Sequence, residues 1–269
     1  MADSSPVFTG SIPTNYQQYL VPFLFEEYAI DLAARLSVAD DGAVLEMACG
    51  TGVVTAHLRA SLPPSVRLIA SDLNSGMLEV AKSVLDDVQG VEYEIADGTD
   101  LQFDDVAFDT IVCQFGVMLF PDKAKGFAES FRVLKPGGCL LFSVWDALEN
   151  NPLSQLIHET IIALSPDDPA TFLGRPHSYS DLNEIRDTLE AAGFRGIDIH
   201  VQPRESRAES AWHVVMGLVA GGPLAAEIEA RGLTEKARDV VEAALRADYG
   251  DGQISAPMQA IIVKAGKPI

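Results

Sequence analysis

Two glycines at the end of an apolar segment form the first feature of this sequence that could bind a ligand. Residues 43–48 (AVLEMA) are followed by Cys49-Gly50-Thr51-Gly52 and then by a helical pattern. Glycines at a strand-to-helix turn let a ligand approach the backbone closely. The start of the helix also presents unpaired N–H groups and the positive end of its dipole. This turn therefore predicts a site for a carboxylate or a phosphate.

Two carboxylates at the ends of the next expected strands extend this site. Asp72 ends the segment RLIASD, and Asp97 ends the segment EYEIAD just before Gly98. The ligand crevice of an open α/β sheet lies outside the carboxyl ends of its strands, where an acid after the second strand can bind both hydroxyls of a ribose. Either carboxylate alone could be a helix cap or a solvated loop residue. Their joint occurrence favours a ligand site.

A nicotinamide dinucleotide site is the competing interpretation, because it shares the glycine turn and the acid after the second strand. Its fingerprint expects a glycine or alanine three residues after the second glycine, where this chain has Thr55, with Ala56 next to it. Glu46, four residues before Gly50, has no role in that fingerprint.

The elements that position these residues follow from a regular alternation of apolar runs and helical patterns. This alternation indicates a parallel sheet with helices on both faces, which is a doubly wound α/β fold. We expect seven strands, at residues 43–48, 67–72, 92–97, 108–115, 139–145, 196–201 and 258–264. We expect the intervening helices at residues 53–61, 76–88, 123–134 and 180–192, with a turn at Lys135-Pro136-Gly137-Gly138.

Three segments fall outside this alternation. Residues 1–40 are expected to form an N-terminal helical arm or lid, with a helical pattern from Asn15 to Leu36 that is interrupted near Pro22. Residues 41–269 would form the main domain. Two helical cap insertions, at about residues 146–178 and 204–249, would lie outside its sheet.

Composition limits the class of protein further. The chain has 269 residues, a formal net charge of −20 and three cysteines without the Cys-x-x-Cys spacing of a zinc site. An acidic surface repels phosphate backbones, so we expect no nucleic-acid partner. No run approaches the ~20 apolar residues of a membrane span, and the N-terminus lacks the pattern of a secretory signal. We therefore expect no membrane insertion, a cytoplasmic location and no bound metal.

Taken together, the motifs resemble those of a known family. VLEMACGTG is similar to the first motif of class I S-adenosylmethionine-dependent methyltransferases, with Ala48 in place of the first glycine. The similarity continues through SDLNSGML, EIADGTDLQFDDVAFDTIVCQFGVMLFPD and FRVLKPGGCLLFSVWD. It points to the small-molecule branch that includes the ubiquinone/menaquinone C-methyltransferases. This resemblance implies a Rossmann-like, mostly parallel sheet whose last strand is antiparallel and lies between strands five and six.

The resemblance also implies roles for individual residues. Glu46, Ala48 and the backbone from Gly50 to Gly52 would surround the methionine part of S-adenosylmethionine, and Asp72 would bind its ribose hydroxyls. The other implied cofactor contacts are Asn74 and Met77 at the ribose and adenine, Asp97 and Gly98 at the adenine, Gln114 and Phe115 at the transferring methyl group, and Tyr19 in the lid.

No motif identifies a catalytic base. Methyl transfer from a sulfonium needs alignment and a dry pocket, and it needs a base only where the acceptor must lose a proton. His177 and His213 fall in the two insertions, where the family builds its substrate cap, and are weak candidates. Each is more readily explained as an ordinary polar residue.

The expected activity is methyl transfer from S-adenosylmethionine to a small-molecule acceptor, with S-adenosylhomocysteine as product. The apolar insertions suggest an aromatic or hydrophobic acceptor, whose burial would exclude water. Two other functions stay open: an S-adenosylmethionine-binding protein without transfer activity, and a nicotinamide-dependent oxidoreductase. The sequence does not identify the acceptor, the methylated atom or the oligomeric state, and it is compatible with a homodimer.

Overall fold

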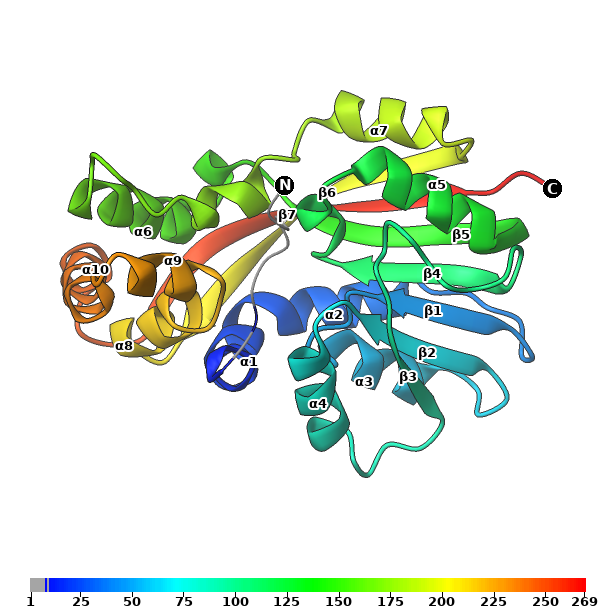
Figure 1. Cartoon of the computed structure of the whole chain (residues 1–269), viewed down its shortest axis with the longest axis horizontal. Coiled ribbons are helices and arrows are strands. Elements are labelled where there is room, and N and C mark those ends of the chain that lie inside the picture. Colours follow the sequence, from blue (N-terminus) through cyan, green and yellow to red (C-terminus); the bar gives the residue numbers. More distant parts are fainter. Residues whose placement is uncertain (1–7, 9) are drawn as a thin grey trace.

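A seven-stranded sheet crosses the molecule with helices on both of its faces (Figure 1). The computed structural model describes Phe8 and residues 10–269. The strand order is β3-β2-β1-β4-β5-β7-β6, and β7 pairs antiparallel with both β5 and β6, whereas the other neighbours are parallel. This arrangement confirms the expected doubly wound sheet and the place of its last strand.

Burial explains why the strands could be recognised in the sequence. The central strands β1 and β4 are covered on both faces, so they are almost continuously apolar. The edge strand β3 instead alternates and exposes Glu92 and Glu94. The strands are β1 (Ala43–Met47), β2 (Arg67–Asp72), β3 (Val91–Ile95), β4 (Phe108–Gln114), β5 (Leu134–Trp145), β6 (Arg195–Ala208) and β7 (Ile254–Gly266).

Four helices link the parallel strands or flank the sheet close to where they were expected. Asp122 and Asp181 cap two of them, since their side chains accept hydrogen bonds from backbone N–H groups of the first turn. These helices are α3 (Val53–Ser61), α4 (Ser75–Val84), α5 (Lys123–Val133) and α7 (Leu182–Ala191). A 3-10 turn, η2 (Val117–Leu119), follows β4.

The N-terminal segment is one nearly continuous run of helix. It consists of α1 (Ile12–Asn15), the π-helix η1 (Tyr16–Phe25) and α2 (Glu26–Ala34). The expected interruption at Pro22 is wrong, because Pro22 lies inside η1. Proline lacks the N–H that an α-helical hydrogen bond would use. The helix continues through Pro22 with the wider i→i+5 hydrogen-bond pattern of a π-helix.

The two insertions gather beyond the carboxyl ends of the parallel strands, on the left of Figure 1. There α10 packs against α6. The first insertion contains η3 (Leu148–Asn150), α6 (Pro152–Leu164) and η4 (Phe172–His177). The second contains α8 (Ala211–Val214), η5 (Val215–Val219), α9 (Leu224–Ala230) and α10 (Thr234–Tyr249).

Two expected boundaries are wrong. Residues 204–208 belong to β6, because that strand and β7 continue as an antiparallel ribbon in which Arg204 pairs with Met258 and Ala208 with Ile254. The polar, proline-containing sequence of this ribbon hides its strand pattern. Lys135-Pro136-Gly137-Gly138 lies within β5 and is not a turn, and Gly137 there has a positive φ of 81°.

No single helix among the described residues is long and apolar enough to span a membrane. Ala211–Val219 and Leu224–Ala230 meet that criterion only as a pair, and the two are bent by 82° relative to each other.

The N-terminal run is fixed to the second insertion by a close approach between its π-helix and η5. Asn15 donates from Nδ2 to the carbonyl of Ala220 at 3.3 Å. A Cβ atom at Gly217 would lie 3.0 Å from the carbonyl oxygen of Tyr19 and 2.8 Å from Cε1 of Phe23. Only glycine therefore allows this packing.

We predict that Gly217→Ala lowers the stability by about 1–3 kcal/mol, because the added methyl group overpacks the contact with η1. A fall of several degrees in the midpoint of thermal unfolding, followed by circular dichroism, would register this change. Gly252→Ala is the matched control, since a Cβ there meets nothing within 4 Å. Equal midpoints for the two variants would contradict the prediction.

Candidate active site

Left-handed backbone shapes the turn after β1. Ala48, Gly50 and Gly52 have φ values of 52°, 57° and 91°. This region costs a residue with a side chain roughly 1–2 kcal/mol, so Ala48 is strained there. A Cβ at Gly116, in the turn after β4, would lie 2.6 Å from Cβ of Ala48. The two turns meet so closely that the second one needs glycine.

Asp72 connects this turn to the next one. Its Oδ2 accepts from the backbone N–H of Gly50 at 2.9 Å, and its Oδ1 accepts from the backbone N–H of Asn74 at 2.8 Å. Burial raises the pKa of the Asp72 carboxyl, and these backbone hydrogen bonds oppose the shift. Asp72 thus fixes the relative position of the loops after β1 and β2.

A pocket opens at this edge of the sheet. It encloses about 840 Å³ of atom-free space including its open mouth, which is within the usual range for a ligand site. Most of the residues predicted for the cofactor line it, namely Ala48, Gly50, Asp72, Asn74, Met77, Asp97, Gly98, Gln114 and Phe115. We call this the polar pocket.

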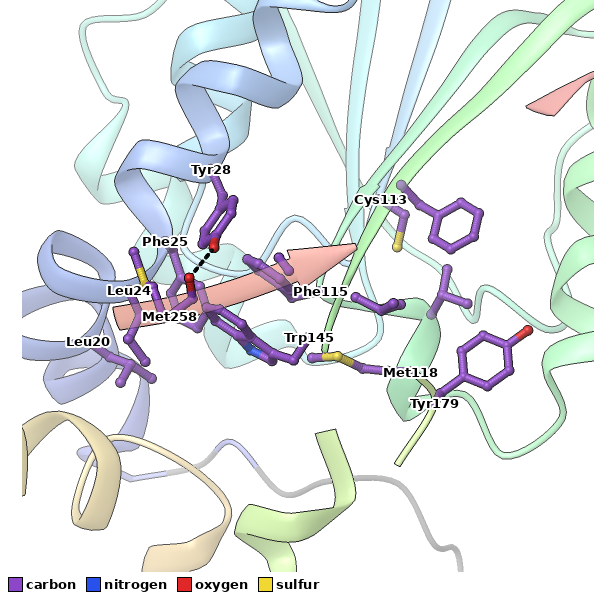
Figure 2. Close-up of a cluster of buried hydrophobic side chains, with 14 of the residues drawn as sticks. Leu20, Leu24, Phe25, Tyr28, Cys113, Phe115, Met118, Trp145, Tyr179 and Met258 are labelled. Atoms are coloured by element: carbon purple, nitrogen blue, oxygen red, sulfur yellow. Dashed lines mark hydrogen bonds between the residues drawn. The ribbon is translucent and has the colours of Figure 1, made fainter. Parts of the chain in front are cut away.

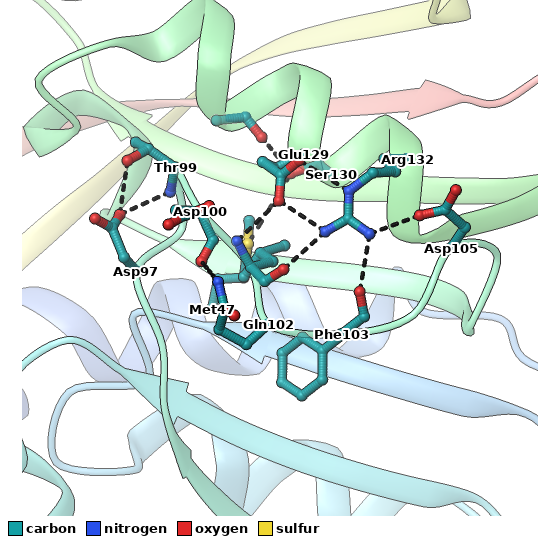
Figure 3. Close-up of polar contacts among 12 residues, drawn as sticks. Met47, Asp97, Thr99, Asp100, Gln102, Phe103, Asp105, Glu129, Ser130 and Arg132 are labelled. Atoms are coloured by element: carbon teal, nitrogen blue, oxygen red, sulfur yellow. Dashed lines mark hydrogen bonds and ion pairs between the residues drawn. The ribbon is translucent and has the colours of Figure 1, made fainter.

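The loop that carries Asp97 is held by a hydrogen-bond network (Figure 3). Asp97 Oδ1 accepts from the backbone N–H and the hydroxyl of Thr99, both at 2.8 Å. Arg132 of α5 donates to the carbonyls of Leu101 and Phe103, and it pairs with Glu129. Among the described residues, the side-chain hydrogen bonds of Asp97 use only Oδ1. Its Oδ2 is therefore the oxygen left to accept from a ligand in the pocket.

Glu46 and Gln114 lie on neighbouring strands and line a smaller cavity below Gly50. Glu46 is buried and its Oε2 accepts from the Thr55 hydroxyl at 2.7 Å. Burial raises the pKa of Glu46 to about 8. Gln114 donates from Nε2 to the Phe25 carbonyl at 3.3 Å, while its Oε1 is buried without a partner. The cavity thus offers acceptors that suit a cationic group.

Three of the predicted cofactor residues lie outside the polar pocket. Glu46 lines only the smaller cavity. Gly52 is the N-cap of α3, and a Cβ there would lie 2.9 Å from Leu85 Cδ1, so this glycine serves packing. Tyr19 makes edge contacts with Trp212 and His213 instead.

Tyr16 lines the polar pocket in place of Tyr19. Its ring stacks on Phe25 with centroids 5.2 Å apart. Burial raises its pKa, and the nearby Asp72 adds to the shift. Tyr16 and Tyr19 lie on the same helix. Which of them faces the pocket depends on the π-helical turn, and the sequence pattern does not show that this helix is a π-helix.

A second pocket adjoins the first and is almost wholly apolar. It encloses about 670 Å³ of atom-free space including its mouth. Both pockets are lined by Phe8, Tyr16, Phe115 and Leu119, so those residues form the shared wall. Figure 2 shows part of its lining, where Phe115 lies against Trp145 with ring centroids 4.1 Å apart. We call this the apolar pocket.

The structure separates the two candidate histidines. His177 lines the apolar pocket and is buried. His213 lines neither pocket, and it is paired with Glu209 at 3.0 Å and Ser210 at 3.0 Å. Within the described part of the chain, no group of three or more His, Cys, Asp or Glu side chains is placed to hold a metal ion.

Sequence comparison identifies relatives of this chain. Residues 24–200 match the model of the ubiE/COQ5 methyltransferase family. The chain is 32% identical over 166 residues to "Demethylmenaquinone methyltransferase" of Clavibacter sepedonicus, a match that covers 58% of this chain and 66% of the relative. It is 30% identical to "Ubiquinone/menaquinone biosynthesis C-methyltransferase UbiE" of Idiomarina loihiensis, over 65% of this chain and 74% of the relative. The match to the first relative thus spans just under two thirds of that protein.

Solved structures share the fold. YcgJ of Bacillus subtilis aligns with a TM-score of 0.60 at 20% identity, over 90% of this chain and 99% of that one. A phosphoethanolamine N-methyltransferase of Haemonchus contortus, determined with S-adenosyl-L-methionine, aligns with a TM-score of 0.59 at 17% identity, over 96% of this chain and 57% of that one.

The fold and the family match place this chain among the methyltransferases. The chain belongs to the ubiE/COQ5 methyltransferase family. Neither the nicotinamide-dependent oxidoreductase nor a binding protein without transfer activity is favoured by these comparisons.

We predict that Asp72→Ala weakens S-adenosylhomocysteine binding by about 1.5–3 kcal/mol, because the Gly50 and Asn74 N–H groups lose their charged partner and the two loops separate. Calorimetry would measure this as a rise of roughly ten- to hundredfold in Kd. Asp181→Ala is the control, since it removes a comparable cap from α7 outside both pockets. Unchanged affinity in Asp72→Ala would exclude Asp72 from the site.

Proposed function

We propose that this protein transfers a methyl group from S-adenosylmethionine to a ring carbon of a compact, apolar, hydroxylated aromatic acceptor such as a hydroquinone. The observation that carries the proposal is the pair of adjoining pockets, one with carboxylates and one apolar, that share a single wall. Methyl transfer needs two ligands in contact at one point and water excluded from that point.

The residues of the polar pocket fit S-adenosylmethionine. Asp97 has a carboxylate oxygen left for the adenine amine, and Asp72 stands at the strand end where ribose hydroxyls bind. The unpartnered Oε1 of Gln114 suits the cationic methionine part, as does the buried Glu46 of the adjoining smaller cavity. When bound, S-adenosylmethionine supplies a methyl group already activated on a sulfonium.

The residues of the apolar pocket fit a flat, mostly hydrocarbon ring. Trp145 and Phe115 offer parallel aromatic surfaces, with an angle of 8° between their planes. Offset stacking on such surfaces holds an aromatic acceptor beyond the effect of burial alone. Ser154 and His177 are polar side chains in the lining, so they can orient a hydroxyl group.

We assign the N-terminal arm of residues 1–40 to a lid and the two insertions to a cap over the acceptor; residues 1–7 and 9 of the arm lie outside the described residues. Leu20 and Leu24 of η1 line the apolar pocket, as do Leu173 of the first insertion and Leu224 of the second. An acceptor must therefore pass between these elements. Their closure around it would keep water from the reacting atoms.

The names of the relatives support carbon as the methylated atom. Two of them are a demethylmenaquinone methyltransferase and a C-methyltransferase of ubiquinone and menaquinone biosynthesis. A hydroquinone ring agrees with the apolar lining and with the few polar groups in it.

Turnover tests the proposal directly. Purified protein with S-adenosylmethionine and chemically reduced naphthohydroquinone should form S-adenosylhomocysteine and a carbon-methylated ring in equal amounts, identified by mass spectrometry and proton NMR. Absence of both products, with S-adenosylhomocysteine still binding, would refute the acceptor class. Methylation at oxygen would refute the choice of atom.

We predict that S-adenosylmethionine binding releases protons through Glu46. Below its pKa of about 8 this carboxyl is neutral in the free protein. A cationic ligand favours the carboxylate, so the proton must leave on binding. Affinity should therefore rise with pH, by up to about tenfold per unit, until it levels off near that pKa.

Calorimetry in buffers of different ionisation enthalpy would count the protons released. Glu46→Gln is the matched variant, and it should release up to about one proton fewer than the wild type at neutral pH. The same number in both proteins would contradict this role for Glu46. Any proton that the ligand itself releases is released with both proteins, so it cancels when the wild type is compared with Glu46→Gln.

We predict that Ser154→Phe raises the KM for the acceptor at least tenfold, because the larger ring fills the apolar pocket that Ser154 lines. Affinity for S-adenosylhomocysteine should not change, since Ser154 does not line the polar pocket. Ser154→Ala controls for loss of the hydroxyl group. Equal KM values for the two variants would place the acceptor elsewhere.

A further inference from the structure

We infer that His177 is the catalytic base, and that its Nε2 takes the hydroxyl proton of the acceptor. This inference rests on the proposed function and adds the residue that activates the acceptor. Among the described histidines, only His177 lines either of the two pockets.

One hydrogen bond fixes the protonation of the His177 ring. Its Nδ1 lies 2.8 Å from the backbone carbonyl oxygen of Asp146. A carbonyl can only accept, so Nδ1 must carry the proton. In the neutral ring the lone pair is then on Nε2, which makes no hydrogen bond to the described residues. His177 therefore presents a proton acceptor in a pocket that is otherwise almost wholly apolar.

The Asp146 carbonyl is held rigidly enough to orient the ring. It also accepts from Asn151 Nδ2 at 3.2 Å, and the Asp146 N–H donates to the Gln259 carbonyl at 3.1 Å. The Asp146 side chain accepts from Gln259 Nε2 at 2.6 Å. These contacts join the end of β5 to β7 and to the first insertion. A base held in this way keeps its direction through the reaction.

Burial, more than the charged groups around it, favours the neutral form of His177. Burial lowers its pKa below the ordinary histidine value, and the imidazole of His158 on α6 lowers it further. Asp146 at the end of β5 acts in the opposite direction. Arg175 stands on the same turn, and Glu227 of α9 is bonded to backbone N–H groups at the start of η4. His177 is accordingly able to accept a proton at neutral pH.

The chemical step balances with this assignment. The hydroxyl O–H bond breaks, its proton moves to Nε2, and the freed electron pair shifts through the ring to the neighbouring carbon. That carbon bonds to the methyl group as the carbon–sulfur bond breaks, and the electron pair of the broken bond stays on sulfur. The ring carbon then loses its hydrogen as a proton, and His177 returns the first proton to the oxygen. One proton is released overall.

The test compares His177→Asn with His213→Asn under the turnover conditions given above. Asparagine keeps an N–H donor near the position of Nδ1 and removes Nε2. We expect kcat of His177→Asn to fall by about a hundredfold or more. Affinity for S-adenosylhomocysteine, which also reports folding, should stay unchanged. His213→Asn should keep kcat within about threefold of the wild type, because His213 lines neither pocket.

The pH profile separates a base from a structural residue. Wild-type kcat should level off above a pKa lower than that of free histidine, whereas kcat of His177→Asn should keep rising until the acceptor itself ionises. Halogenated naphthohydroquinones with more acidic hydroxyls should recover much of the lost rate. If His177→Asn kept the wild-type kcat and pH profile, the inference about His177 would be wrong, while the proposed function would still stand. A wild type without turnover would refute the proposed function, and the inference with it.

Discussion

The arrangement of the polar pocket depends on one carboxylate that holds two loops together. Asp72 accepts from the N–H groups of Gly50 and Asn74, which follow β1 and β2. The loops would otherwise diverge, because each leaves the sheet toward a different helix. Its burial raises the energy of the charged form, and the backbone hydrogen bonds offset part of that cost. The pocket is thus built around a carboxyl group whose hydrogen bonds to both loops are made without a ligand.

Backbone strain in two of the turns that line the pocket serves the same arrangement. Ala48 and Phe115 both have left-handed backbone, although neither is glycine. The Phe115 ring stacks against Trp145, and Phe115 is one of the residues that line both pockets. Strain of this kind persists only where the surrounding packing outweighs it, and it is concentrated at functional sites. The residues that line both pockets therefore fix how the two pockets adjoin.

The seven strands and the positions of Gly50, Asp72 and Asp97 at strand ends were predictable from local patterns. The place of the last strand and the roles of the other predicted residues came from the family resemblance. Gly50, Asp72 and Asp97 stand at strand ends, where parallel topology brings them together. Tyr16 was not distinguished from Tyr19, because the π-helix changes the face that each residue presents. His177 could not be preferred to His213, since the difference arises from a long-range bond to Asp146 and from packing of the caps. The extension of β6 was hidden by its polar sequence.

The central claim is that the polar pocket holds the methyl donor and the apolar pocket holds the acceptor, with the two in contact beside Phe115. A crystal structure with S-adenosylhomocysteine and naphthohydroquinone would test it most directly. The account predicts the adenosyl group between Asp72 and Asp97, and the aromatic ring beside Trp145 with a hydroxyl group toward His177. Electron density for either molecule outside these pockets, or for both in one of them, would contradict it.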